Sequence, residues 1–308
     1  MKSALKKLRI VKKINDFRWR EHMTHPGKED KDKVYYVIRR HDINAGLFSF
    51  ACTNLASIRV CEQKGYIPVI DMQNSPNSML TSDEYGKVNA WDQFFMQPEG
   101  VMLQDLSKKK NVILGEIHPP KLYPDYGMLE SKEELDMWLS LSRKYLKLLP
   151  SHKEAAIEYK EKTFGDNKVL AIVARGTDYI KLKPHNHPIQ PQQEDLINKA
   201  KEMMERHNCK YIYLATEDEK IWKRFKDEFP EKVYSYQQNH YEVPEGKYIA
   251  DIANKIQTPY ERNKEYLISI AVASMCNFLL AGASGGSYGA MFLSDGFEEQ
   301  YIYKLGRY

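Results

Sequence analysis

A permanent cation stands where an apolar run of the sequence stops. Residues 169–174 are uniformly apolar, as expected for a strand buried on both faces, and Arg175 follows them directly. Asp178 and His187 come shortly afterwards. Because a guanidinium group is costly to bury without a partner, Arg175 is expected either to pair with an acid such as Asp178 or to clamp an anion in a cleft.

A second stretch with affinity for anions lies near the end of the chain. The apolar residues 278–281 run into Ser284, Gly285 and Gly286, and a helical pattern follows. A helix that begins there would present free backbone N–H groups and its positive dipole end to an anion. The alternative is a tight turn that uses glycine for steric reasons. Neither Gly-x-Gly-x-x-Gly nor the phosphate-loop motif occurs, which excludes a nicotinamide dehydrogenase, and the two features together favour a diphosphate site.

Strand-like and helix-like segments alternate along most of the chain, which predicts an α/β fold with parallel sheets. We expect a basic arm over residues 1–30, a Rossmann-like acceptor domain over 31–155 and a Rossmann-like nucleotide-sugar domain over 156–308, whose last helix could pack back on the acceptor domain. Ligands of such sheets bind outside the carboxyl ends of the strands, where Arg175, Thr216 and Ser284 fall.

The basic charge is concentrated at the N-terminus. The 308-residue chain has a net charge of only +4, which is too mild to indicate nucleic acid as a partner. Residues 1–20 can form a basic amphipathic helix, which either docks on the protein itself or lies on an anionic membrane surface. No signal peptide and no transmembrane run is present, and the four scattered cysteines favour a reduced, cytoplasmic location without zinc or disulfides.

Three sequence blocks, in order, carry a resemblance to the fucosyltransferase superfamily that includes α-1,6-fucosyltransferases, rhizobial nodulation fucosyltransferases and protein O-fucosyltransferases. "IVARGTDY" with the later "HPI" resembles the family's first block, "YIYLATEDE" its second, and "YLISIAVASMCNFLLAGASGGSYGAM" its third. The resemblance covers about residues 166–294, and "INAGLFSFACTNLASI" takes the place of the family's N-terminal glycine turn. It implies a GT-B fold, in which two Rossmann-like, doubly wound domains face a cleft.

The resemblance also implies residue roles. Arg175 inherits the contact with the donor's β-phosphate, and Ser284 with its loop, including Gly285, helps to hold the same diphosphate. Thr216 would line the donor pocket, and Gly46 would approach the phosphates from across the cleft.

The sequence departs from the family at positions that read the base and perform catalysis. An acid that core α-1,6 enzymes use to read guanine aligns with Ser269, and Val173 stands where those enzymes have a histidine. Glu265 lies one helical turn from Ser269 on the same face, so it either substitutes as the guanine reader or is a solvated helix-start glutamate. Lys183 stands at the position of the family's proposed catalytic glutamate, which leaves the acceptor side open.

Sugar transfer needs a stabilised leaving group and a base. The one Asp-x-Asp match, Asp30 to Asp32, precedes the first strand, so no metal is expected and Arg175 takes the metal's place. The candidates for the base are Asp178 and His187, with two further alternatives: Asp42 and His185.

These expectations lead to one functional hypothesis. The chain is expected to be a metal-independent, inverting glycosyltransferase with no cofactor, which transfers fucose from GDP-fucose to a glycan or lipid-linked glycan, as in surface polysaccharide biosynthesis. The alternatives are a transferase of the same fold with another nucleotide sugar, and a non-catalytic descendant that binds nucleotides or glycans. The expected location is the cytoplasm, with contact at the inner membrane face through residues 1–20.

The basic arm yields a first prediction. Deletion of residues 1–20 should abolish sedimentation with vesicles that contain anionic lipid. This segment contains eight Lys and Arg residues and only one acidic residue, so its net positive charge attracts anionic lipid. Vesicles of neutral lipid are the control. Unchanged sedimentation of the truncated protein would contradict the membrane role.

Overall fold

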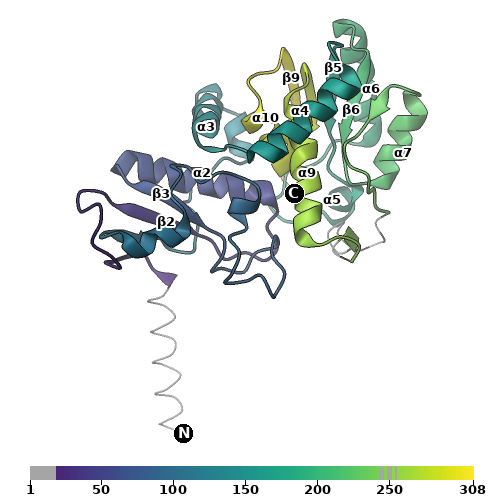
Figure 1. The fold of residues 1–308 in the computed structure, drawn as a ribbon. Helices are drawn as coiled ribbons and strands as arrows, with labels where there is room; N and C mark the ends of the chain where they lie inside the picture. Colours follow the sequence, from purple (N-terminus) through teal and green to yellow (C-terminus); the bar gives the residue numbers. More distant parts are fainter. Residues whose placement is uncertain (1–18, 243, 245, 248–251, 254) are drawn as a thin grey trace.

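The computed structural model describes residues 19–242, 244, 246–247, 252–253 and 255–308, and of Thr177 and Asp178 only the backbone (Figure 1). Residues 1–18 of the predicted basic arm over 1–30 therefore lie outside the described residues. Within the described residues, no helix is both long and apolar enough to cross a bilayer.

The N-terminal half contains a four-stranded sheet in the order β1-β4-β2-β3. Its strands are β1 (His22–Thr24), β2 (Tyr35–Arg39), β3 (Ile67–Asp71) and β4 (Val112–Leu114). β2 pairs in parallel with β3 and β4, as the sequence predicts, whereas β1 is an unpredicted antiparallel edge strand.

The C-terminal half contains a five-stranded parallel sheet in the order β7-β6-β5-β8-β9. Its strands are β5 (Val169–Val173), β6 (Tyr211–Ala215), β7 (Val233–Tyr234), β8 (Phe278–Gly282) and β9 (Glu299–Tyr303). β9 was not expected, because none of its residues is buried and the segment has no continuous apolar run. The strands of both sheets are parallel except for β1, which confirms the predicted α/β class.

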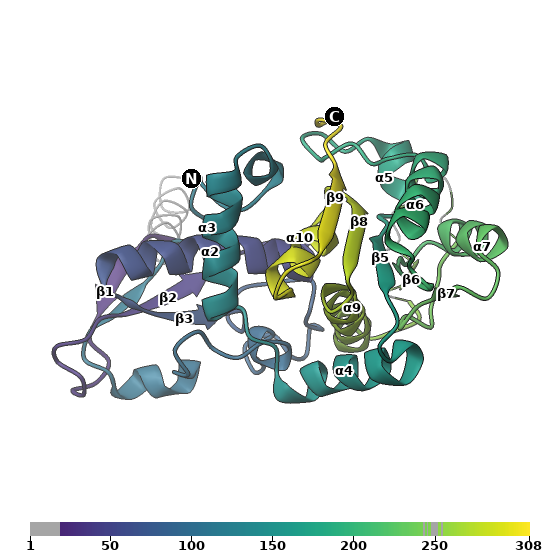
Figure 2. The ribbon, with the colours of Figure 1, turned by 90° about the horizontal axis from the view of Figure 1, so that it is seen from above.

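The helices fill the connections between the strands. They are α2 (Leu47–Lys64), α3 (Lys132–Tyr145), α4 (Pro150–Phe164), α5 (Thr177–Leu182), α6 (Gln193–His207), α7 (Glu219–Glu228), α9 (Pro259–Ser274) and α10 (Gly285–Leu293), with short 3-10 turns at Trp91–Gln93, Leu103–Lys108 and Tyr126–Leu129. In Figure 2, α6 and α7 lie on one side of the second sheet, and α4, α9 and α10 on the other.

Strand β5 shows why the sheet needs helices on both faces. Val169, Ala171 and Val173 pack into the core shared with α9 and α10, while Leu170 and Ile172 face the core under α6 and α7. Side chains alternate across a strand, so a strand covered on both faces is apolar at every position.

Helix boundaries agree with the sequence at some ends and not at others. Ser131 with Glu134 three residues later is a sequence pattern typical of a helix start, and the Ser131 hydroxyl caps α3 by accepting the Glu134 N–H at 3.2 Å. From the sequence, residues 41–49 are expected to form a turn, but α2 already begins at Leu47, so this expectation is wrong for the last three residues. Phe48 and Phe50 are fully buried there, so tertiary packing extends the helix toward its N-terminus.

The two halves meet through α10, which packs against α2 and α3. At Gly289 the helix approaches α2 so closely that a Cβ atom would lie 2.4 Å from the Phe48 ring. The Ser142 hydroxyl of α3 donates a hydrogen bond to the Phe292 carbonyl at 3.2 Å.

This close packing gives a stability prediction. Gly289→Ala should lower the free energy of unfolding by about 1–3 kcal/mol, because the buried Phe48 ring cannot move away without disturbing the core. Urea unfolding measures the change. Gly285→Ala is the matched control, since its Cβ would meet the nearest atom, Phe48 Cβ, at an ordinary 3.5 Å. Equal stabilities of the two variants would contradict the prediction.

Candidate functional site

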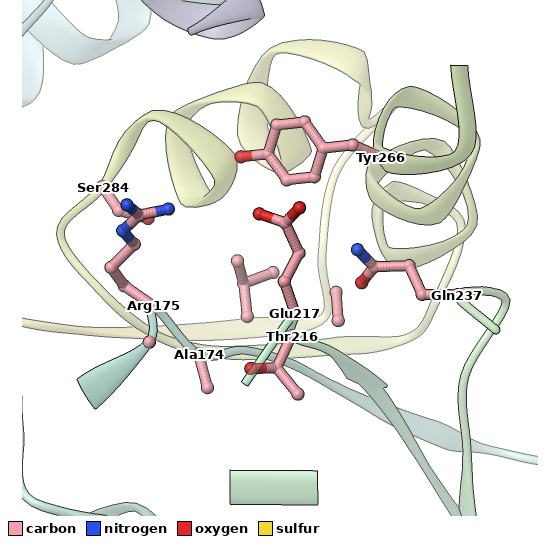
Figure 3. A pocket seen from close by; sticks show the side chains of 10 residues that line it. Ala174, Arg175, Thr216, Glu217, Gln237, Tyr266 and Ser284 are labelled. Carbon is pink, nitrogen blue, oxygen red and sulfur yellow. The ribbon is translucent and has the colours of Figure 1, made fainter. Parts of the chain in front are cut away.

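A narrow pocket opens where the strands of the second sheet end (Figure 3). Its walls come from the segments after β5, β6, β7 and β8 and from α9: Val173, Ala174, Arg175, Gly176, Ala215, Thr216, Glu217, Gln237, Tyr266 and Ser284. The cavity volume is about 30 Å³, so a ligand as large as a nucleotide could place only part of itself inside.

Arg175 lies at the tip of β5, as predicted, and its guanidinium carbon is 4.1 Å from the centroid of the Tyr179 ring. Such cation–π contact stabilises an arginine without neutralising its charge. The His187 ring packs edge-on against the same Tyr179 ring, with the two ring centroids 5.2 Å apart. The structure thus joins Arg175 and His187 through one aromatic ring.

His187 is held in place by its backbone. Its carbonyl accepts the Tyr308 N–H at 3.1 Å, and its own N–H donates to the Pro184 carbonyl at 3.1 Å. The residue as a whole is exposed and does not line the pocket, but partial burial of its imidazole and, secondarily, the positive charge of Arg175 lower the pKa of the His187 imidazole below its ordinary value. The ring is therefore neutral at pH 7, which is the state a proton acceptor needs.

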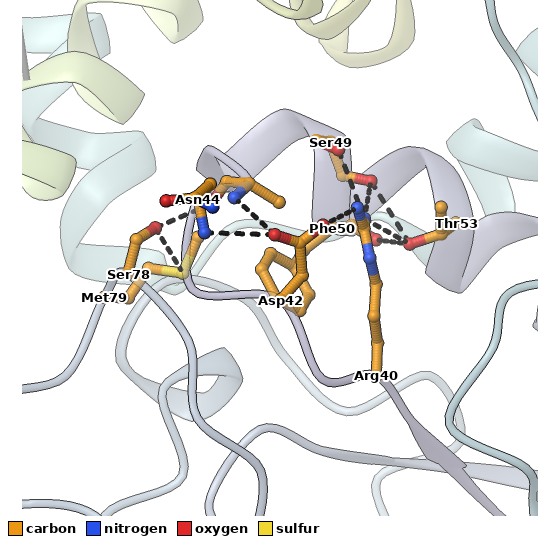
Figure 4. A network of polar contacts seen from close by, with 9 residues as sticks. Arg40, Asp42, Asn44, Ser49, Phe50, Thr53, Ser78 and Met79 are labelled. Carbon is orange, nitrogen blue, oxygen red and sulfur yellow. Dashed lines mark hydrogen bonds and ion pairs between the residues drawn. The ribbon is translucent and has the colours of Figure 1, made fainter.

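The side chain of Asp178, the other candidate base, lies outside the described residues; its backbone is part of the first turn of α5. Asp42 is an anchor of a loop: one carboxylate oxygen pairs with Arg40 at 2.6 Å, and the other accepts the N–H groups of Asn44 and Ala45 (Figure 4). His185 is exposed and does not line the pocket.

Ser284 caps α10 with a reciprocal pair of hydrogen bonds. Its hydroxyl accepts the Ser287 N–H at 3.3 Å, and the Ser287 hydroxyl accepts the Ser284 N–H at 2.8 Å. The first turn, which begins with Gly285, is thereby fixed with its positive end at the pocket edge. Gly285 lies on the side of α10 next to Phe48 of α2, where an added Cβ would be 3.5 Å from the Phe48 Cβ, and it is not a wall residue of the pocket.

Thr216 lines the pocket and is 3% exposed. Its hydroxyl accepts the Asp218 N–H at 3.2 Å, and Asp218 in turn caps α7. Glu217 between them is a pocket residue that we did not predict. It forms a two-point ion pair with Arg262, at 3.0 and 3.2 Å. Its place directly after a buried strand was the only signal for it in the sequence.

Gly46 and Glu265 do not line this pocket. Gly46 is exposed at the start of α2 and has a φ of −78°, which any residue can adopt. The Arg40 network holds the loop before it, with Arg40 donating to the Ser49 carbonyl at 3.0 Å and to the Thr53 hydroxyl at 3.1 Å (Figure 4). The donor-binding role of Gly46 stays a prediction.

Glu265 lies in a second, larger cavity of about 680 Å³ between α4, α9 and the segment after β7. Its carboxylate accepts the Gln238 N–H at 2.5 Å and the Gln257 amide at 2.7 Å. Ser269, one turn along α9, is fully buried and bonded to Tyr213 at 2.9 Å. The proposed guanine-reading role of Glu265 stays a prediction.

Within the described part of the chain, no three His, Cys, Asp or Glu side chains are grouped as a metal site would require.

The contacts of Tyr179 with Arg175 and His187 lead to a prediction about the pKa of His187. Arg175→Gln should raise the His187 pKa, because one of the two causes of its depression is removed while burial remains. An NMR titration of the imidazole protons measures it, with Arg224→Gln on the exposed face of α7 as control. Since the unfolded chain binds the proton more tightly than the native one, wild-type stability should fall as the pH drops below about 6.5, and less so in Arg175→Gln. An unchanged titration would contradict this coupling.

Comparisons with known proteins give similarity at the level of structure. No protein-family model and no curated protein sequence matches the chain. Among solved structures, the apo form of POFUT1 has a TM-score of 0.56 at 9% identity, covering 90% of this chain and 100% of that one. A mutant of Arabidopsis thaliana FUT1 in complex with GDP has a TM-score of 0.50 at 11% identity, covering 89% and 71%. The fucosyltransferase NodZ from Bradyrhizobium has a TM-score of 0.47 at 14% identity, covering 85% and 94%. The chain therefore has the GT-B fold of the fucosyltransferases.

Proposed function

We propose that the protein is a glycosyltransferase that transfers fucose from GDP-fucose to a glycan acceptor, with inversion and without a metal ion. The observation that carries the proposal is the shared pocket of Arg175 and Ser284, which brings a guanidinium group and a capped helix N-terminus to adjacent strand ends. The fold supports it, since FUT1 of this fold was solved with GDP. The small volume of the pocket is also consistent with a donor that lies mostly across its rim.

In the proposed mechanism the acceptor hydroxyl attacks the anomeric carbon of fucose as the bond to the diphosphate breaks. Negative charge then grows on the departing oxygen. Arg175 and the first-turn N–H groups of α10 stabilise that charge, and Thr216 and the loop through Gly285 line its surroundings. The proton of the acceptor passes to a base, for which the neutral His187 and Asp178 are the candidates.

Donor binding and acceptor binding are assigned to different halves of the chain. We assign the donor to residues 156–308, which supply every wall residue of the pocket, and the acceptor to residues 31–155. Gly46 would meet the donor from the acceptor side. An enzyme of surface polysaccharide synthesis, cytoplasmic and held at the inner membrane face by residues 1–20, would meet a lipid-linked acceptor there.

Two observations favour a function other than fucosyl transfer from GDP-fucose. The buried, hydrogen-bonded Ser269 leaves no carboxylate at the position that reads guanine in core α-1,6 enzymes, so Glu265 or another group must do so, or the donor carries another base. Lys183, which ends α5, offers no carboxylate for catalysis at the position of the family's glutamate. A different nucleotide sugar and a non-catalytic binding protein are the corresponding alternatives.

Ligand binding and transfer can be measured on the same protein. GDP at about 100 times its Kd should stabilise the fold by about 2.7 kcal/mol, whereas UDP should not. Arg175→Ala should lower the transfer or hydrolysis rate of GDP-fucose by about 10²–10³-fold, as the loss of one donor to a developing anion does. Arg224→Ala, which removes a surface arginine of the same half, is the control.

The outcomes separate the alternatives. Stabilisation by UDP and not by GDP would mean that the base of the donor is uracil and not guanine. Binding of GDP without any turnover in the wild type would favour the non-catalytic protein. An Arg175→Ala variant that is as active as the wild type would refute the proposed role of the guanidinium group.

A further inference from the structure

The Tyr266 hydroxyl is a polar group in the pocket to which neither the sequence nor the comparisons assign a role. Tyr266 projects from α9, and its hydroxyl is turned toward the side of the pocket where Arg175 and Ser284 lie (Figure 3). Among the described residues, this hydroxyl has no hydrogen-bond partner, and its pKa is influenced first by burial and then by the charges around the pocket, with Arg175 foremost. A half-buried phenol that faces a pocket without a partner is a candidate ligand contact.

The ring of Tyr266 is held rigidly. The Phe48 ring of α2 meets it edge-on, with the centroids 5.6 Å apart. On the other side, a Cβ atom at position 286 would lie 2.7 Å from the Tyr266 oxygen, so only a glycine leaves room for the hydroxyl at the first turn of α10. The hydroxyl is therefore placed beside the backbone of the helix N-terminus by packing from both halves of the chain.

The groups around the hydroxyl select the kind of ligand. Arg175 and the first turn of α10 both favour negative charge, and the hydroxyl oxygens of Ser284 and Ser287 already accept hydrogen bonds within the cap of that helix. The carboxylate of Glu217, which also lines the pocket, is engaged by both nitrogens of its ion pair with Arg262. Burial raises the pKa of the Tyr266 phenol, so the group keeps its proton at neutral pH and can donate it in a hydrogen bond.

We propose that the Tyr266 hydroxyl donates a hydrogen bond to a non-bridging oxygen of the donor's diphosphate, an inference that rests on the proposed function. It thus forms the third side of an anion site, opposite Arg175 and beside α10. The contact is charge-assisted, which makes it stronger than a hydrogen bond between neutral groups.

Binding to Tyr266→Phe tests the inference by isothermal titration calorimetry. The variant should bind GDP about 10- to 100-fold more weakly than the wild type, as expected for the loss of a hydrogen bond to a charged group. Guanosine, which has no phosphate, should bind both proteins equally. Tyr260→Phe is the matched control, because it removes a phenol oxygen from the same helix outside the pocket, where the ring packs on Phe94.

A second variant probes the placement of the hydroxyl. Gly286→Ala should weaken GDP binding in the wild type, because its Cβ displaces the Tyr266 oxygen, and should weaken it less in the Tyr266→Phe background, where that oxygen is absent. Equal losses in the two backgrounds would mean that the two positions act independently, against the inference.

The remaining results are also decisive. Equal GDP affinity of Tyr266→Phe and the wild type, or an equal loss for guanosine, would overturn the tyrosine contact while leaving the proposed function in place. A wild-type protein that binds neither GDP nor inorganic pyrophosphate would overturn the proposed function, and this inference with it.

Discussion

The parallel pairing of β5 with β6 and β8 is the constraint on which the rest of the site depends. Val173 lies in register with Ala215 on one side and with Ala281 on the other, so three strands end at one edge. The residues that follow them in the chain, Arg175 and Ser284 among them, must then meet in one place. Residues more than a hundred positions apart share a pocket for this reason alone.

The two charged side chains of the pocket, Arg175 and Glu217, have neighbours of different kinds. Arg175 rests on the face of Tyr179, which stabilises the cation but leaves its charge in place. Glu217, in contrast, is matched by Arg262 through two hydrogen bonds. The ion pair makes Glu217 a poor partner for a second cation.

Helix α10 links the pocket to the contact between the two halves of the chain. Its N-terminus, capped by Ser284, lies at the pocket, and its side at Gly289 packs against Phe48 of α2. Phe48 also contacts Tyr266. The single buried ring of Phe48 thus packs both in the contact between the two halves and against a wall residue of the pocket.

The sequence by itself determined the α/β class and the strand ends that carry Arg175, Thr216 and Ser284, because an uninterrupted apolar run followed by a polar residue is a local pattern. It could not reveal β9, an edge strand without a buried residue, nor the start of α2, which the burial of Phe48 decides.

Only the tertiary structure decided which side chains join the site. Tyr266 and Glu217 belong to it, and Glu265 faces a separate cavity, although residues 265 and 266 are neighbours on one helix. Adjacent residues of a helix point in directions about 100° apart, so their surroundings depend on what packs around the helix, and this is information that no local pattern contains.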